Sequence, residues 1–404
     1  MIRTFPRNFG LMLLVVAVTG SAIAQAPAPP IKIGAINVLS GSFAAYGKSG
    51  RQGAQLAIDE INAAGGLLGR KLELIQVDGQ AKPDVGVQEA RRLILNEKVN
   101  FLIGIDSSSV SLAVAPLTNE YKIPLVVMHA ATPALTEQCN PYVFRTSNNA
   151  RMDAYAAADL AAKLPYKRWA NIGPDYEFGH SSWNDFMARL KEKRPDIQFV
   201  GEQWPKGGES NYTPYITALL QERPEGVFSV LWAGDLVTFV RQANAFGFFK
   251  QIKVFQDPVG AALESIGPMG NEAPIGELFS TRYWFLQSQS PVNKKFVEAY
   301  HHKFGEWPSY NAQEHYAGVQ MLAAAVRKAK SLDADAIKKA FEADGGMTYE
   351  APEGKKWMRP ADHQVFEALV WGYTTPSNGQ YPFVILKDIT MFPEKDTVYP
   401  TKCK

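Results

Sequence analysis

A run of three serines at 107–109 follows the apolar segment 101–105, with Asp106 between them. A helical stretch comes next, and a second apolar run, 123–128, leads into the small residues 130–132. Strand, turn, helix and parallel strand in this order place both turns at the carboxyl edge of one sheet. Hydroxyls and unpaired backbone N–H groups at a helix start attract anions, so this edge could hold a carboxylate. A plain N-cap is the alternative role for one serine.

Asp106 stands immediately before the serines. A carboxylate that faced a bound anion would repel it. This residue therefore weighs against an anionic ligand unless its side chain points sideways or caps the helix. The direction in which Asp106 points is a test of the anion prediction.

Other kinds of site find little support. Residues 41–49 follow a strand and open a helix, as a phosphate-binding loop would, but five residues separate Gly41 from Gly47 where that motif requires four. The six histidines are scattered, and neither HExxH nor CxxC spacing occurs. The sequence also lacks a Gly-x-Ser-x-Gly nucleophile elbow. We therefore predict no metal, no cofactor and no enzymatic activity.

The first 24 residues are typical of a secretory signal peptide. Arg3 and Arg7 precede the apolar run 11–18, and small residues at 22–24 fit a cleavage site near Ala24. The run is shorter than the roughly 20 residues that a membrane span needs. Without this segment the formal net charge falls from +2 to zero, because it holds two arginines and no acids. Nucleic acid and anionic membranes are then poor partners.

Strands and helices alternate along the chain in two successive sets. Such alternation predicts doubly wound parallel sheets, so we expect an α/β fold with two similar lobes. The region 291–341 is strongly helical and has too few strands for its own α/β domain, so it should pack back onto the first set. The expected strands are 31–36, 72–77, 101–105, 123–128, 169–172, 197–203, 226–231, 253–256, 364–372 and 383–389.

Several fragments occur in the order and spacing of a known family. They are Ile33-Gly34-Ala35, the loop 39–47, the helix 53–66, the turn 130–136, Phe144-Arg145-Thr146, and the segments 176–179, 241–243 and 246–247. With these fragments and an export signal, the chain resembles the periplasmic solute-binding proteins of ABC importers, of the leucine/isoleucine/valine-binding type. The resemblance covers nearly the whole mature chain.

This resemblance implies a type I periplasmic binding fold, in which three crossover strands join two lobes that close on a solute. The crossovers are expected near residues 145–148, 281–284 and 346–349. Lobe 1 would comprise residues 31–147 and 283–347, and lobe 2 would comprise residues 149–281 and 350–404.

The chain has two cysteines, Cys139 and Cys403. An exported protein with a single pair can form a disulfide, which here would tie the tail to the first lobe. Two free thiols are the alternative, and the sequence does not decide between them.

The resemblance also implies where a solute would bind. Its carboxylate would be held by Ser107, Ser108, Ala130 and Thr132. Asp257 occupies the position where the family commonly keeps an acid for the ammonium group of an amino acid, although turn formation is the alternative role. The remaining walls would come from Tyr46, Phe178 and Trp232.

The expected function is that of a monomeric periplasmic receptor that delivers a small hydrophobic amino acid of the branched-chain type to an ABC permease. Phe178 and Trp232 lack or move the hydroxyl of the tyrosines that related amino-acid binders often carry. This favours a larger or flatter solute, so aromatic carboxylates are the alternative. A ligand-sensing module for a signalling partner shares the fold and is a further alternative.

Overall fold

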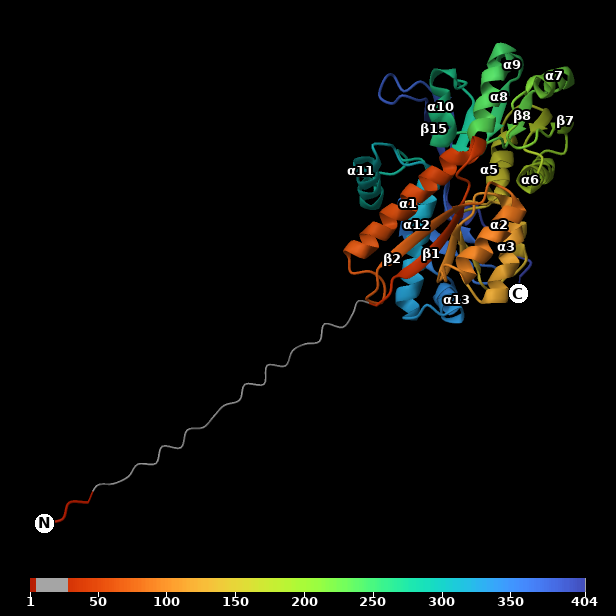
Figure 1. Ribbon diagram of the computed structural model, residues 1–404. Helices are drawn as coiled ribbons and strands as arrows, with labels where there is room; N and C mark the ends of the chain where they lie inside the picture. Colours follow the sequence, from red (N-terminus) through yellow and green to blue (C-terminus); the bar gives the residue numbers. More distant parts are fainter. Residues whose placement is uncertain (5–27, 404) are drawn as a thin grey trace.

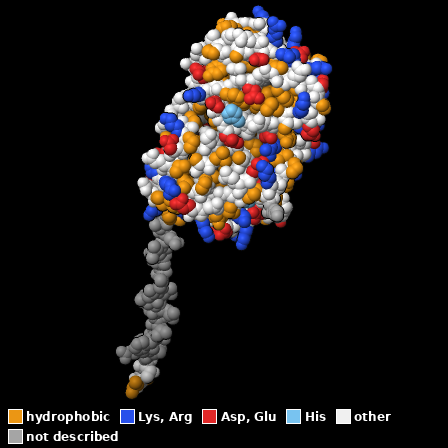
Figure 2. Space-filling model, turned by 90° about the vertical axis from the view of Figure 1, so that its right-hand side faces the viewer, with side chains coloured by type: hydrophobic (Ala, Val, Ile, Leu, Met, Phe, Trp, Pro, Cys, Tyr) orange, Lys and Arg blue, Asp and Glu red, His pale blue; other side chains and the backbone are white. Residues whose placement is uncertain are grey.

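The computed structural model describes residues 1–4 and 28–403. The predicted signal peptide therefore lies outside the described residues, apart from its first four. Figure 1 shows two halves, one containing the red and orange segments and the other containing the green ones. Figure 2 shows acidic and basic side chains interspersed over one face rather than gathered in patches. No helix in the described part of the chain is long and apolar enough to cross a membrane.

The first lobe is built on a parallel sheet of five strands. They are β1 (Ile31–Asn37), β2 (Leu72–Asp78), β3 (Phe101–Gly104), β4 (Leu125–Val127) and β5 (Val143–Arg145). Their order across the sheet is β2-β1-β3-β4-β5. β3, β4 and β5 are buried along their whole length, as expected for short apolar runs that helices cover on both faces.

Helices from two distant parts of the chain cover this sheet. They are α1 (Ala44–Ala63), α2 (Pro83–Leu95), α3 (Ser108–Tyr121), α4 (Ala134–Glu137), α11 (Pro291–Phe304), α12 (Tyr310–Ala329) and α13 (Ala334–Glu342). α1 lies along α12, and a Cβ atom on Gly53 would come within 1.9 Å of the Ala312 carbonyl oxygen. The helical region therefore packs back onto the first lobe, as predicted (Figure 1).

The second lobe contains a seven-stranded sheet in the order β15-β14-β10-β9-β8-β6-β7. Its strands are β6 (Arg168–Ile172), β7 (Gln198–Gln203), β8 (Gly226–Ser229), β9 (Val254–Asp257), β10 (Leu278–Thr281), β14 (Leu369–Thr375) and β15 (Ile385–Phe392). β15 pairs antiparallel with β14, β14 pairs antiparallel with β10, and the remaining neighbours are parallel. Its helices are α5 (Ala150–Ala161), α6 (Glu177–Lys193), α7 (Thr213–Glu222), α8 (Ala233–Ala245), α9 (Phe248–Gln251) and α10 (Leu263–Met269).

A third, antiparallel sheet lies beside the end of β5. Its strands are β11 (Thr348–Ala351), β12 (Gly354–Met358) and β13 (Val365–Phe366). Arg145 donates its backbone N–H to the carbonyl of His363 at 3.0 Å and forms a parallel bridge with Gln364. We expected all of residues 350–404 in lobe 2. Only β14 and β15 join its sheet, because these bonds hold the small sheet against the first lobe.

A buried charge cluster connects this small sheet to the hinge. The Lys356 ammonium lies 2.9 Å from Glu314, 2.7 Å from Glu353 and beside Glu367, and it donates to the carbonyl of Thr146. All four charged side chains are 0% exposed. Burial lowers the pKa of Lys356, but the three carboxylates outweigh it and hold that pKa well above its usual value. Burial raises the pKa of Glu314 strongly and that of Glu353 to about 7.

The tail crosses back to the first lobe after β15. The structure joins Cys139 and Cys403 in a disulfide, with their Cα atoms 5.6 Å apart. Lys402 pairs with Glu137 of α4 at 2.7 Å. The hydroxyl of Tyr399 accepts a hydrogen bond from the side chain of Asn149 at 2.5 Å. Residues 399–403 are therefore fixed along the boundary between the lobes.

Candidate functional site

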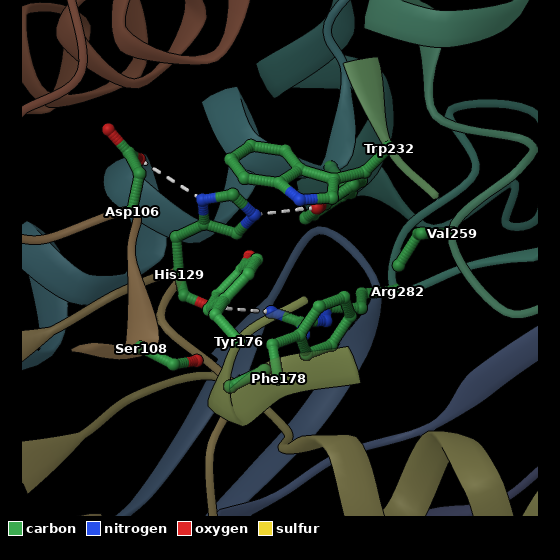
Figure 3. Close-up of a pocket in the computed structure, with 10 residues that line it drawn as sticks. Asp106, Ser108, His129, Tyr176, Phe178, Trp232, Val259 and Arg282 are labelled. Atoms are coloured by element: carbon green, nitrogen blue, oxygen red, sulfur yellow. Dashed lines mark hydrogen bonds and ion pairs between the residues drawn. The ribbon is translucent and has the colours of Figure 1, made fainter. Parts of the chain in front are cut away.

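A small cavity of about 20 Å³ lies between the lobes, lined by residues that follow strands of both main sheets (Figure 3). Among its walls are Ser108, His129, Tyr176, Phe178, Trp232 and Arg282. A wider cleft of about 530 Å³ adjoins it and shares Tyr176 and Trp232. Both lobes contribute to both spaces, so a molecule held here would bridge the lobes.

The predicted hydroxyl edge is present, and each of its members has a different role. Ser107 is the N-cap residue of α3, but its side chain makes no capping bond within the described chain; it lines the wider cleft. Ser108 lines the cavity, and its hydroxyl accepts the backbone N–H of Thr132 at 3.2 Å. The hydroxyl of Thr132 donates to Glu177 of the second lobe at 2.9 Å. Ala130 is buried and donates its N–H to a backbone carbonyl, and Ala131 lines the cavity instead.

Asp106 also lines the cavity, but its carboxylate is hydrogen-bonded within the first lobe. Its carboxylate accepts the backbone N–H of Val38 at 2.7 Å and lies 3.1 Å from Nδ1 of His129. Burial alone would raise the pKa of Asp106, but the hydrogen bond from His129, together with His315 and the backbone N–H of Val38, outweighs burial and lowers it. An ionised Asp106 is therefore already occupied by donors of its own lobe, which reduces its conflict with a bound anion.

His129 and Tyr310 continue this chain of hydrogen bonds along the cavity wall. Burial lowers the pKa of His129, so the ring is neutral at pH 7. Nδ1 carries the proton because it faces the Asp106 carboxylate. Nε2 must then accept from the Tyr310 hydroxyl, 2.7 Å away. The lone pairs of the Tyr310 oxygen remain available to a donor on a solute.

Arg282 brings a positive charge to the cavity from the segment that follows β10. Its guanidinium donates to the carbonyl of His129 at 2.9 Å and lies 3.4 Å from Asp153. Its Nε has no hydrogen-bond partner among the described residues, although the side chain is only 1% exposed. Burial raises the pKa of Asp153 to about 6 in spite of this neighbour. A carboxylate would satisfy the free N–H with a charge-assisted bond.

The three predicted aromatic residues all lie at the boundary between the lobes. Trp232 of the second lobe stacks on Phe43 of the first with ring centroids 4.0 Å apart. Tyr46 stacks on His129 at 4.9 Å and meets the edge of Trp232 at 5.0 Å. Phe178 lines the cavity directly. Aromatic rings from both lobes thus surround the hydroxyl groups at the strand ends of the first lobe.

Comparison with known proteins identifies the family to which this chain belongs. A family model described as periplasmic binding protein matches residues 30–379, most of the chain. The chain belongs to the periplasmic binding protein family. The predicted family and fold class are thereby confirmed.

Relatives and solved structures agree with this assignment. "Leu/Ile/Val-binding protein homolog 7" of Brucella suis is 27% identical over 344 residues, which cover 82% of this chain and 86% of the relative. The solute-binding protein of an ABC transporter from Rhodopseudomonas palustris BisB5, solved with 3,4-dihydroxybenzoic acid, has a TM-score of 0.82 and 27% identity and covers 90% of this chain and 98% of its own. The leucine-binding protein LivK of Thermotoga maritima has a TM-score of 0.77 at 24% identity and covers 89% of this chain and 98% of its own.

In this periplasmic binding protein Asp257 does not line the small cavity; Val259, two residues later, does. The Asp257 side chain is fully buried at the end of β9, where one oxygen accepts the Val259 N–H at 2.9 Å and the other has no partner in the described chain. Burial raises its pKa to about 8. A neutral, covered carboxyl attracts an ammonium group weakly, so the expected amine contact needs a rearrangement of this loop.

His129 and Arg282 are the site residues that sequence reasoning missed. His129 stands one position before the predicted Ala130–Ala131–Thr132 turn, so its place at the end of β4 was available as a signal. Arg282 follows a strand with no periodic pattern around it, and a lone arginine in such a place is usually exposed. Its burial depends on Asp153 and His129, which lie more than a hundred residues earlier in the chain.

Proposed function

We propose that this protein is the solute receptor of an ABC importer, exported to the periplasm with cleavage near Ala24 and acting as a monomer by binding rather than catalysis. The observation that carries the proposal is the space between the lobes, lined by Ser108, aromatic rings and a buried guanidinium with a free N–H. These groups suit a small molecule with a carboxylate and an apolar body. Membership of the periplasmic binding protein family supports it.

The receptor works by hinge closure. Thr132 of lobe 1 donates to Glu177 of lobe 2, and Trp232 of lobe 2 inserts against Phe43 of lobe 1. A solute that touches both lobes stabilises the closed arrangement over the open one, and only that difference in affinity drives the change. The permease then receives the closed, loaded form.

A small hydrophobic amino acid of the branched-chain type is the first candidate solute. The names of the Brucella relatives support it, and the hydroxyl edge at Ser107, Ser108, Ala130 and Thr132 offers a place for an α-carboxylate. The apolar side chain would lie against Tyr46, Phe178 and Trp232. Asp257 would meet the ammonium group after its loop rearranges.

Aromatic carboxylates are the second candidate, and a specific observation favours them. Rings of Tyr176, Phe178 and Trp232 line the cavity beside Arg282, whereas Asp257 lies outside it. This combination suits a flat anion that carries no amine. The Rhodopseudomonas palustris protein solved with 3,4-dihydroxybenzoic acid supports this candidate.

Thermal-shift measurements on the purified mature protein separate the two candidates. A ligand that binds only the folded protein raises the midpoint by an amount that grows with the logarithm of its concentration above Kd. We expect a shift with leucine, isoleucine or valine, and a shift with 3,4-dihydroxybenzoate alone would replace the first candidate by the second. Mass spectrometry after incubation should recover the ligand unchanged. Chemical conversion, or no shift with any of these compounds, would contradict the proposal.

A further inference from the structure

A second pocket of about 470 Å³ lies between the lobes, away from the central cavity. We call it the flank pocket. Lobe 1 contributes the start of α1 and the connection between α11 and α12, and lobe 2 contributes α10 and the residues Pro382 and Phe383. In Figure 1 these elements meet where α10 and α11 approach α1. The consecutive residues Ser309 and Tyr310 face the flank pocket and the central cavity respectively, so the start of α12 separates the two spaces.

Aromatic side chains form much of the flank pocket wall. Trp307 stacks on Phe285 with centroids 5.3 Å apart and on His301 at 4.2 Å, which fixes the indole in place. Tyr300 and Phe383 also line the pocket. Its volume falls within the range of about 300–1,000 Å³ that is typical of small-molecule sites. Rigid rings of this kind bind apolar bodies and cations.

Glu264 supplies the polar group. It projects from α10 of lobe 2, and one of its oxygens accepts the hydroxyls of Ser49 and Ser309 of lobe 1, each at 2.5 Å. The other oxygen has no hydrogen-bond partner in the described chain, and the residue is 8% exposed. A buried carboxylate with half of its acceptors unused is costly unless a donor or a cation reaches it.

Above about pH 7 the flank pocket holds an excess of negative charge. Its lysine, Lys48, pairs with Glu306 at 2.5 Å at the exposed rim, so these two charges cancel. Glu264 remains without a cation, and burial raises its pKa to about 7 although the two serines act in the opposite direction. The remaining charge in this pocket therefore calls for a positive partner.

We propose that the flank pocket is a second binding site, which takes a small organic ammonium ion with an apolar or aromatic body. The ammonium group meets the free oxygen of Glu264, and the body packs against Trp307 and Phe383. Both lobes contact the occupant, so it favours their closed arrangement. Binding of the ammonium ion should therefore strengthen solute binding in the central cavity. By linkage, the solute strengthens binding of the ammonium ion by the same factor.

Binding of the cation depends on the ionisation of Glu264. The titratable and charged groups that face it are Lys48, Glu306, Tyr46, Tyr300, Tyr310 and Asp106. Burial raises the pKa of each of the three tyrosines, so they stay neutral. Affinity for the ammonium ion should therefore rise as the pH passes from 6 to 8, because Glu264 loses its proton over that range.

Isothermal titration of the mature protein with benzylammonium at pH 8 tests the proposal. We expect saturable binding, at least tenfold tighter than that of benzyl alcohol, which has a similar shape and no charge. Glu264→Gln keeps the bonds to both serines and should weaken benzylammonium at least tenfold. Glu306→Gln, at the rim, is the matched control and should change affinity less than threefold. Equal binding of the two probes, or unchanged affinity in Glu264→Gln, would overturn the site.

A second variant and a competition experiment complete the test. Trp307→Leu should also weaken benzylammonium at least tenfold, while circular dichroism shows that each variant is folded. If a central-cavity ligand displaces benzylammonium, the probe binds at the wrong site and the proposal fails. The benzylammonium titration uses no central-cavity solute. It therefore tests the flank pocket even if the proposed receptor function is wrong.

Discussion

The buried charges at the hinge and those between the lobes are partnered differently. At the hinge, the Lys356 ammonium meets three carboxylates and a backbone carbonyl. In the central cavity Arg282 keeps one N–H free, and in the flank pocket Glu264 keeps one oxygen free. All three side chains are at least nine-tenths buried. Burial alone thus does not distinguish a structural charge from one that is available to a ligand.

One oxygen of Glu314 at the hinge also has no hydrogen-bond partner in the described chain, so the difference lies in whether the charged group lines a cavity. A buried charge with all of its bonds made holds segments together, and its loss leaves its partners uncompensated. A buried charge with an unused donor or acceptor carries a desolvation cost that a ligand can relieve. On this basis we propose that Lys356 fixes the crossovers, whereas Arg282 and Glu264 are available to ligands. The following experiments test this division.

Lys356→Met should have the largest effect. It leaves Glu314, Glu353 and Glu367 buried without a cation, and breaking such a cluster costs about 3–5 kcal/mol. Urea denaturation of the mature protein measures this loss. Lys48→Met, at an exposed ion pair, should cost less than about 1 kcal/mol. If Lys356→Met lowers the free energy of unfolding by less than about 1 kcal/mol, the hinge does not depend on this charge cluster.

Arg282→Gln should weaken an anionic solute by about 2–4 kcal/mol, or roughly 30- to 1,000-fold in Kd. Isothermal titration of the best ligand from the thermal-shift screen measures it. Because the change also leaves Asp153 without its cation, the double variant with Asp153→Asn separates folding from binding. If the double variant binds as tightly as the native protein, the guanidinium is structural and the comparison with Lys356 fails.

Asp257→Asn should alter the pH dependence of stability. The folded pKa of about 8 lies above the ordinary value of 3.8, so the stability from this carboxyl is present in acid and is lost as pH rises toward 8. The asparagine variant escapes this loss. The difference in melting temperature between the variant and the native protein should therefore increase from pH 5 to pH 9. Each kcal/mol of stability that the variant keeps corresponds to about 2–4 °C. A flat difference would mean that Asp257 is ionised when folded.

The same variant tests the expected role of Asp257 in binding. If its carboxyl pairs with an ammonium group, Asp257→Asn should weaken leucine far more than 3,4-dihydroxybenzoate. Titrations of both ligands against both proteins give this comparison. Equal losses would assign the residue to the shape of the loop alone.

Ser107→Ala should give the smallest effect. A hydroxyl that donates to a bound carboxylate contributes about 0.5–1.5 kcal/mol, or roughly 2- to 13-fold in Kd. The melting temperature without ligand should not change, because this side chain makes no capping bond in the described chain. A lower melting temperature with unchanged affinity would instead identify Ser107 as a helix cap.

Much of the fold could be predicted from the sequence because its main strands are apolar runs. The runs at 101–105 and 123–128 became β3 and β4, and the helical region after 291 packed against α1 as expected. The β11–β13 sheet was missed. Its strands are short and contain Lys356, and their pairing depends on contacts with Arg145 and Glu314 that are distant in sequence. Local pattern carries no signal for such contacts.

The site was predictable where it depends on strand ends and not where it depends on long-range partners. Ser107, Ser108, Phe178 and Trp232 line the spaces between the lobes, as their positions after strands implied. The inward turn of Asp106 required His129 and Val38, and no local spacing shows that hydrogen bond. The free N–H of Arg282 and the free oxygen of Glu264 are properties of the assembled molecule, so only the structure reveals them.

The bond between Cys139 and Cys403 spans 264 positions and encloses every strand of the second sheet. If lobe 2 unravels while lobe 1 stays intact, its polypeptide remains anchored to lobe 1 at both ends. The disordered segment then samples fewer conformations, which makes partial unfolding of that lobe less favourable. An oxidising compartment would thus protect half of the molecule from proteases through a covalent link that lies outside that half.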